Sequence, residues 1–350
     1  MKIFFLCLAV LLFIAQNSIE QSSGANTLSL RKPPYYKDLL TSTPYYWDKS
    51  LEKITNPKIS IRNRLYNVTD DIYFTFQLIN QETCLNFEKK DNPITNSIGI
   101  NFYLSSDGKN VVTLSNNPKS PTNVSLQESV YKNATSLAFY IGLALGLIPE
   151  VARPDRNIDV KVDMNNVQDD YKKYYKIALP GVVPYLKDTD FDFKSAMFFG
   201  SDFGLSNGKQ STYIVDLYKD YQYPSTVSKS FSHNDYKHMY YYYCDGSKKQ
   251  NNCKYGGYPF PKDQRYCKCP YYLDGNKCEN FIFRNNLIHT FAERITKKSL
   301  VASDTEECVI VNLTDELLYL NVTSKNNKKN VSIVVEELTF ERNDCKIDKS

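Results

Sequence analysis

The chain of 350 residues is long enough for two or three domains, and its 42% hydrophobic and 23% charged residues are typical of a globular protein. Its 43 Lys and Arg against 39 Asp and Glu leave a formal net charge of +4, which argues against a nucleic-acid binder with a broad basic face. Only three histidines are present, so functions that need several histidines close in sequence are nearly excluded.

The first residues have the pattern of a secretory signal peptide. A basic Lys2 precedes an unbroken apolar run, Ile3 to Ala15, which polar residues follow. This run, like a second one at 137–148, is too short to span a membrane. We therefore expect residues 1–18 to be removed and the mature chain to be secreted to the extracellular space without a membrane span.

Cysteines and glycosylation motifs agree with export. Without Cys7 of the signal, eight cysteines remain, an even number suited to disulfide bonds in an oxidising compartment. Six N-x-[ST] motifs predict a glycoprotein. The acceptor residues are Asn67, Asn123, Asn133, Asn312, Asn321 and Asn330.

Three segments of the middle section predict strands, because apolar and polar residues alternate or β-branched residues are frequent: 58–62, 97–103 and 110–114. Between them, Thr69 and the two aspartates that follow predict the cap of a helix that runs toward Cys84.

A second helix is predicted from the apolar run at 137–148. Asn133-Ala-Thr135 would cap its start, and Gly146 and Pro149 would end it.

The end of the chain has two further patterns. Four cysteines between Cys253 and Cys278 hold a segment that is too small to build a core of its own. From Glu279 onward, apolar and polar residues alternate, which predicts an antiparallel β module closed by Cys308 and Cys345.

Residues 135–167 resemble the active-site region of the astacin-type zinc metalloendopeptidases, which carry H-E-x-x-H-x-x-G-x-x-H-E followed by an R-P-D-R-D-N-Y-V-like stretch. Gly146, Glu150 and the segment from Arg153 to Asn157 are in register with it. Four further segments resemble family landmarks in the same order: 47–49, 82–87, 191–200 and 243–244.

The resemblance implies an α+β fold, with a two-lobed metzincin/astacin-like protease domain at 44–244 after a short N-terminal segment at 19–43. Residues 245–280 resemble the EGF-like module that often follows this domain. Residues 281–350 resemble, more weakly, a truncated β-sandwich of the CUB-like type.

The catalytic positions of the family are replaced in this chain. The three zinc-ligand positions hold Phe139, Leu143 and Pro149, none of which has a lone pair for Zn²⁺. The general-base position holds Tyr140, whose ordinary pKa near 10 is too high for a base at neutral pH. The tyrosine that follows the family's methionine turn is Phe199 here.

The favoured hypothesis is therefore a pseudoprotease without catalytic residues, metal ligands or cofactor, which binds extracellular protein or peptide. His233 and His238 are five residues apart, a spacing that does not replace the lost ligand pair. Family membership alone implies the first alternative, an active zinc-dependent metalloendopeptidase that cleaves extracellular proteins. The 28 tyrosines suggest the second, a structural matrix component.

The resemblance also implies a disulfide pattern. Cys84–Cys244 would span the protease-like domain, whereas the family's second bridge would need cysteines near Tyr103 and Tyr131, and both are absent. The remaining expected pairs are Cys253–Cys267, Cys269–Cys278 and Cys308–Cys345.

We expect structural roles for the retained landmarks: a helix-ending turn, core packing and a network of ion pairs. These residues are Gly146, Met197, Glu150, Arg153, Asp155 and Arg156. Where zinc would lie, we expect Phe139, Leu143 and Phe199 to converge in a dry apolar plug, with Pro149 stiffening the adjacent turn.

Overall fold

The computed structural model describes residues 42–55, 67–179, 186, 188–215, 230–244, 252–263, 265–271 and 273–280, and the backbone alone of 56–61, 64–66, 281, 294–302 and 316–324. The chain divides into two compact units, Met1–Asn280 and Phe281–Ser350. The predicted signal peptide, the Cys308–Cys345 pair, and the motifs at Asn312 and Asn330 lie outside the described residues.

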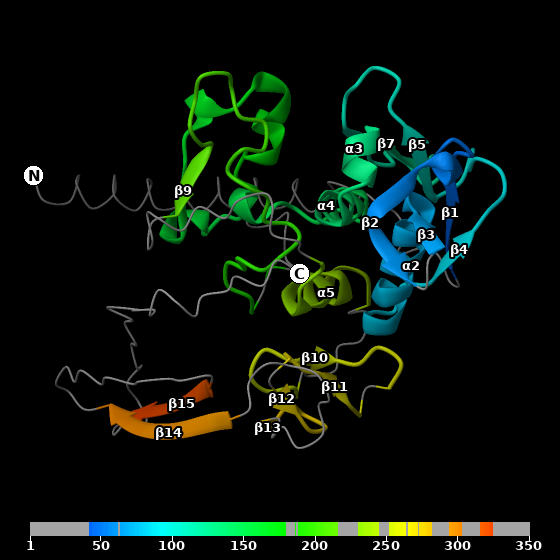
Figure 1. Ribbon diagram of the computed structural model, residues 1–350. Coiled ribbons are helices and arrows are strands. Elements are labelled where there is room, and N and C mark those ends of the chain that lie inside the picture. The colour runs from blue at the N-terminus through cyan, green and yellow to red at the C-terminus, as the bar shows by residue number, and fades with distance from the viewer. Residues whose placement is uncertain are drawn as a thin grey trace, which may run out of the picture. The chain divides into compact units, whose positions relative to one another are not determined.

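The first unit contains a five-stranded mixed sheet (Figure 1). Its strands are β1 (Thr43–Trp47), β4 (Phe87–Lys89), β5 (Ile100–Leu104), β6 (Val111–Thr113) and β7 (Thr122–Leu126). They run in the order β4-β1-β5-β7-β6, and only the β6–β7 pair is antiparallel. The predicted strands at 97–103 and 110–114 are therefore confirmed, and β6 is an edge strand among the strands that the structure describes.

The third predicted strand lies in a separate antiparallel hairpin, β2 (Thr55–Ile61) and β3 (Arg64–Asn67), after the short helix η2 (Leu51–Lys53). Helix α2 (Val68–Glu82) begins directly after this hairpin. Its cap is Asn67 rather than the predicted Thr69, because Asn67 and Asp70 have the three-residue spacing of a reciprocal capping box.

Helix α2 packs against the sheet through its buried residues. Its Phe76 ring lies 4.7 Å from the ring of Tyr45 on β1 and stacks on Phe87 of β4 at 4.1 Å. The aromatic side chains of α2 and the sheet thus form one part of the core.

The predicted second helix is α4 (Ala134–Ala144), which follows the short α3 (Glu128–Tyr131) and contacts β6 and β7. As expected, the Asn133 side chain caps α4 and accepts a hydrogen bond from the Ser136 N–H at 3.0 Å. The side chains of α4 are apolar on nearly all sides of the helix, and most of them are buried. Gly146 ends the turn after α4 with a φ of 81°, a conformation that favours glycine.

The rest of the protease-like region has mostly short elements: η3 (Glu150–Ala152), η4 (Arg156–Ile158), β8 (Val160–Val162), η5 (Met164–Asn166), η6 (Asp169–Tyr174), β9 (Tyr213–Val215), α5 (His233–Met239) and η9 (Tyr240–Cys244). β8 and β9 pair antiparallel. The expected disulfide between Cys84 and Cys244 is present, with Cα atoms 5.7 Å apart. Cys84 lies two residues after the end of α2, and Cys244 is the last residue of η9.

A small cysteine-rich module follows, with strands β10 (Tyr258–Pro259), β11 (Cys267–Lys268), β12 (Leu273–Asp274) and β13 (Asn280–Phe281). It contains the expected disulfides Cys253–Cys267 and Cys269–Cys278. The module is anchored to the end of α2: Tyr258 Oη donates to the Glu82 carbonyl at 3.1 Å, and Lys268 Nζ lies 3.0 Å from Glu82 Oε1.

In the second unit, β14 (Arg294–Ala302) and β15 (Glu316–Ser324) pair in parallel. The other segments of the antiparallel module expected at 281–350 lie outside the described residues, so its antiparallel pairing stays a prediction. Parallel neighbours need a connection of about a dozen residues, and the segment 303–315 between these strands is long enough to provide one. Within the described part of the chain, no helix is long and apolar enough to cross a membrane.

Candidate functional site

Helix α4 carries three of the positions that the family resemblance assigns to catalysis. Phe139 and Tyr140 are buried, with 3% and 2% of their surface exposed, and Leu143 is partly buried against the core. Burial raises the pKa of Tyr140 above its ordinary value of 10, so its phenol stays protonated at neutral pH. This face of α4 therefore offers no base and no charged ligand.

The Phe139 ring meets Phe199, as the sequence predicts. The two ring centroids lie 5.4 Å apart at an interplanar angle of 90°. Phe203 packs against both rings: it stacks on Phe199 at 4.3 Å and lies 5.4 Å from Phe139. Tyr174 and Tyr175 complete the group at 6.1 Å from Phe139 and 5.0 Å from Phe199, respectively. We call these five residues the aromatic cluster.

Sequence reasoning missed three members of this cluster. Phe203 follows Phe199 by four residues, and Tyr174 and Tyr175 are neighbours in a tyrosine-rich stretch. These aromatic residues were visible in the sequence, but nothing in it paired them with α4. Pro149 is buried and precedes η3 with a φ of −59°.

Met197 lies against α4, where the resemblance places it. A side chain at Gly142 would collide with Met197 Sδ, so glycine at this helical position allows the close approach. The carbonyl of Met197 also accepts a hydrogen bond from the Glu150 N–H at 3.0 Å. The methionine segment and the segment after α4 are thus tied together.

The expected network of Arg153, Asp155 and Arg156 is present only in part. Arg153 Nε and Nη2 each donate to the Asp155 carboxylate at 2.9 Å, which forms a bidentate ion pair. Arg156 takes no part in it. Its guanidinium donates instead to the carbonyl oxygens of Val151 and Tyr175, because its side chain is buried beside backbone rather than beside a carboxylate.

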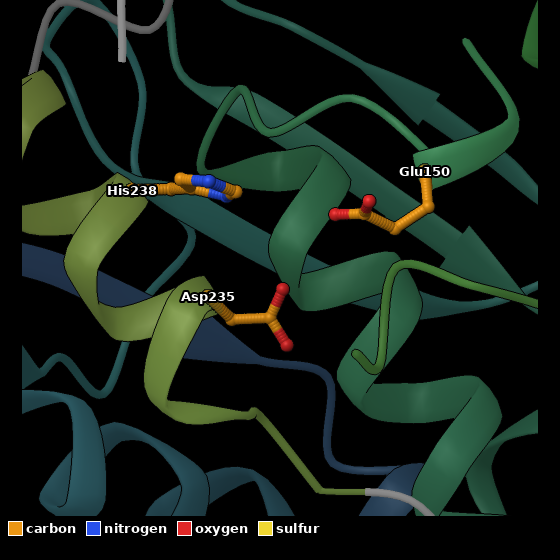
Figure 2. Close-up of side chains that lie close together, drawn as sticks. All are labelled: Glu150, Asp235 and His238. Atoms are coloured by element: carbon orange, nitrogen blue, oxygen red, sulfur yellow. The ribbon is translucent and has the colours of Figure 1, made fainter. Parts of the chain in front are cut away.

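A second group of functional side chains surrounds Glu150 (Figure 2). One oxygen of Glu150, one oxygen of Asp235 and one ring nitrogen of His238 lie within 4.8 Å of one another. All three side chains are buried, and Figure 2 shows those of Asp235 and His238 extending from α5 toward Glu150. We call these residues the polar cluster. The sequence predicted a structural role for Glu150 but did not place Asp235 and His238 beside it.

Hydrogen bonds hold each member of the polar cluster. Asp235 Oδ1 accepts from Ser195 Oγ at 2.6 Å, and Oδ2 accepts from the N–H groups of Ala196 and Ser232 at 3.0 and 2.8 Å. Glu150 Oε2 accepts from the Asp192 N–H at 3.1 Å. His238 Nε2 lies 2.7 Å from Thr189 Oγ1.

Burial shifts the acid–base equilibria of all three groups. It raises the pKa of Glu150 to about 8, although the Arg153 charge opposes the shift, and it raises the pKa of Asp235 to about 6 against the hydrogen bond from Ser195. It lowers the pKa of His238 to about 3, with help from the charges of Arg153 and Lys237. His238 is therefore neutral at physiological pH.

The described glycosylation motifs differ in their surroundings. Asn133 is exposed, whereas Asn67 and Asn123 are half-buried. The side-chain oxygen of Asn123 accepts a hydrogen bond from Asn101 at 3.0 Å. Asn321 lies in β15, of which the backbone alone is described.

The mixed sheet, the buried helix α4, the Gly146 turn and the methionine beneath α4 define a metzincin-like protease domain of mixed α and β content. The sequence profile of the astacin family of peptidases matches residues 58–244, more than half of the chain. The chain therefore belongs to the astacin family.

Similar proteins include zinc metalloproteinases of nematodes. The chain is 30% identical over 207 residues to zinc metalloproteinase nas-36 of Haemonchus contortus, and 31% identical over 202 residues to zinc metalloproteinase dpy-31 of Brugia malayi. Each match covers 57% of this chain but only 32% and 33% of the relatives, so the chain spans about a third of their length.

Among solved structures, the chain is similar to high choriolytic enzyme 1, a hatching enzyme zinc-protease from Oryzias latipes (medaka fish). The TM-score is 0.43 and the sequence identity 15%, over 57% of this chain and 88% of that chain.

Proposed function

We propose that this astacin family member is a secreted, glycosylated pseudoprotease that binds extracellular protein or peptide without cleaving it. The observation that carries the proposal is the aromatic cluster. Phe139 and Phe199 occupy two positions that serve catalysis in the family, and their rings pack against each other and against Phe203.

Zinc does not fit the residues at the family's ligand positions. Zn²⁺ takes nitrogen, sulfur or oxygen ligands, and Phe139, Leu143 and Pro149 offer none from their side chains. The packed rings around Phe139 would also have to separate to admit an ion with its water. No step of peptide hydrolysis can therefore be derived for this position.

The edge strand β6 is a surface on which an extended peptide could be held. β6 lies last in the sheet order and pairs with β7 on one side only among the described strands. An extended peptide can add to such an edge through main-chain hydrogen bonds, which require no catalytic residue. Binding would thus survive the loss of the metal site.

We also propose that the C-terminal parts are an EGF-like module at 245–280 and a CUB-like module at 281–350, and that residues 1–18 are a cleaved signal. Two disulfides within 253–278 and the anchoring of this module at Glu82 support a rigid accessory domain. Such a module would present a binding surface in a fixed relation to the protease-like domain.

The test combines cleavage and binding. The purified secreted chain is incubated with denatured protein substrates with and without a chelator, and a peptide library is screened for binding by fluorescence anisotropy. We expect saturable peptide binding and no chelator-sensitive cleavage. Cleavage that a chelator abolishes would instead establish the alternative, an active zinc metalloendopeptidase, which the names of the nematode relatives favour.

The matrix alternative rests on exposed tyrosines: Tyr73, Tyr255, Tyr266 and Tyr271 are between 44% and 68% exposed. Incorporation of the chain into an insoluble, tyrosine-cross-linked fraction, without peptide binding, would favour this second function.

A further inference from the structure

The polar cluster has the composition and burial of a small metal site. Two carboxylates and one imidazole converge, and Glu150, Asp235 and His238 are 2%, 0% and 3% exposed. Buried carboxyl groups in proteins are normally protonated, paired with a cation or bound to a metal ion. The two acids of the polar cluster therefore need either protons or a cation to balance them.

Arg153 is the nearest cation in the described part of the chain, and it is largely committed elsewhere. Its Nε and Nη2 both donate to Asp155 at 2.9 Å, and Nη2 also donates to the Thr189 carbonyl at 2.6 Å. Its Nε lies 3.7 Å from Glu150 Oε2, beyond a hydrogen bond. The guanidinium that lies nearest to Glu150 is thus paired mainly with Asp155.

Each carboxylate retains capacity to bind a cation. Of the two oxygens of Glu150, only Oε2 receives a hydrogen bond from the described residues, and Figure 2 shows the other members of the cluster on the side toward which this carboxylate extends. A carboxylate oxygen has two lone pairs, and Asp235 Oδ1 uses one of them for Ser195. Both acids can therefore offer an oxygen.

The imidazole is held as metal-binding histidines are. Nε2 of His238 lies 2.7 Å from Thr189 Oγ1, and Thr189 Oγ1 is also within hydrogen-bond distance of the Leu186 carbonyl at 2.8 Å. One ring nitrogen of His238 is thus held by a hydroxyl group. A second hydrogen bond that fixes the tautomer is typical of histidine ligands.

We propose that Glu150, Asp235 and His238 bind one divalent transition-metal ion of the zinc class, at a site different from the family's catalytic position. Zinc forms bonds of about 2.0–2.2 Å, which places tetrahedral ligands about 3.4 Å apart. The ligand atoms, which now lie within 4.8 Å of one another, would have to approach to that separation when the ion binds. The nitrogen ligand selects zinc or cobalt over calcium and magnesium, which prefer oxygen ligands.

This ion would have a structural role. It would join the segment after α4 to α5, because Glu150 belongs to η3 and the other two ligands belong to α5. Burial of all three ligands keeps a protein substrate away from the ion. The proposal is therefore independent of the pseudoprotease hypothesis and would leave the chain without proteolytic activity.

The test is metal binding by the full secreted chain after removal of bound metal with a chelator. Isothermal titration with Zn²⁺ should give one equivalent, and the melting temperature should rise with Zn²⁺ concentration. E150Q and H238Q, which keep the side-chain size, should each weaken binding by about 100-fold or more. H233Q changes the other histidine of α5 and should leave the affinity unchanged.

Co²⁺ bound to the wild-type chain provides a measurement that does not depend on the folding of the variants. A visible spectrum typical of a four- or five-coordinate nitrogen–oxygen site is expected. Absence of stoichiometric binding to the wild type, a purely hexaaqua-like Co²⁺ spectrum, or binding that both variants retain would overturn the proposal. If protons on Glu150 and Asp235 are all that balances the polar cluster, the wild type will show no stoichiometric metal binding.

Discussion

Two buried regions of the molecule, the aromatic cluster and the polar cluster, have opposite chemistry. In the aromatic cluster, Phe139 and Phe199 pack ring against ring. In the polar cluster, which begins one residue after Pro149, Glu150 remains a buried acid, and hydrogen bonds from three groups surround Asp235.

This difference shows two ways in which a protein keeps a region folded. Aromatic rings need no specific partner and are stabilised by burial and by their edge-to-face geometry. Buried acids need donors in fixed places, because an unsatisfied carboxylate is costly. The aromatic region should therefore respond to changes in side-chain volume, and the polar region to changes in pH and hydrogen bonding.

The largest effect should follow from F139A. This change removes a ring that contacts Phe199 and Phe203, and we expect the free energy of unfolding to fall by about 3–5 kcal/mol. Urea denaturation followed by circular dichroism measures the change. I158A, at a side chain that is 77% exposed, is the control and should shift stability by less than about 0.5 kcal/mol. Equal effects of the two variants would mean that the aromatic cluster is not a packed core.

In the polar cluster, D235A should lower the free energy of unfolding by about 3 kcal/mol. It leaves Ser195 Oγ–H and the N–H groups of Ala196 and Ser232 without their acceptor and removes a cap of α5. D91A, at an exposed aspartate, is the matched control. Denaturation as above measures both, and a loss for D235A no larger than that of D91A would contradict the role of Asp235.

The pH dependence should separate the two regions. The pKa of Glu150 is raised from 4.5 to about 8, so the folded state favours the protonated acid. The stability this provides is present below the unfolded value and is lost as the pH rises through 8. Between pH 6 and 9, the chelator-treated wild type should lose about 2 kcal/mol more than E150Q. Urea midpoints measured across this range would reveal it. Parallel curves for the two proteins would show that Glu150 is not protonated in the folded state.

The smallest effect concerns a position where the family resemblance implies a disulfide. Tyr131 is fully buried and donates from Oη to the Tyr103 carbonyl at 2.9 Å, so a hydrogen bond joins the two positions that lack the second bridge. Y131F should lower stability by about 1 kcal/mol. Thermal unfolding measures the loss, with exposed Y271F as the control. No difference between the two variants would mean that this hydrogen bond adds nothing to stability.

The sequence predicted the features that depend on local pattern or on family landmarks. Helix α4 follows from an apolar run with Asn133 before it, and three disulfides follow the cysteine positions. The partners of Glu150 could not be predicted, because Asp235 and His238 lie more than 80 residues away and reach it only through the packing of α5.

The pairing of β15 with β14 was likewise beyond the sequence pattern. Alternation of apolar and polar residues predicts a strand but not its partner or its orientation. The α2 cap was misplaced by two residues for a related reason. Asn67 and Thr69 are both good caps, and the reciprocal bond with Asp70 decides between them.

The Cys84–Cys244 disulfide also determines how the chain would carry mechanical force. A pull applied between β1 and the cysteine-rich module passes along α2, crosses the sulfur–sulfur bond and reaches the module, whose Lys268 and Tyr258 are fastened to Glu82 beside it. The loop between the two cysteines, with both clusters, lies outside this load path. If the disulfide were reduced, the force would also act on the loop between the two cysteines. Their separation of 160 residues corresponds to about 500 Å of fully extended chain.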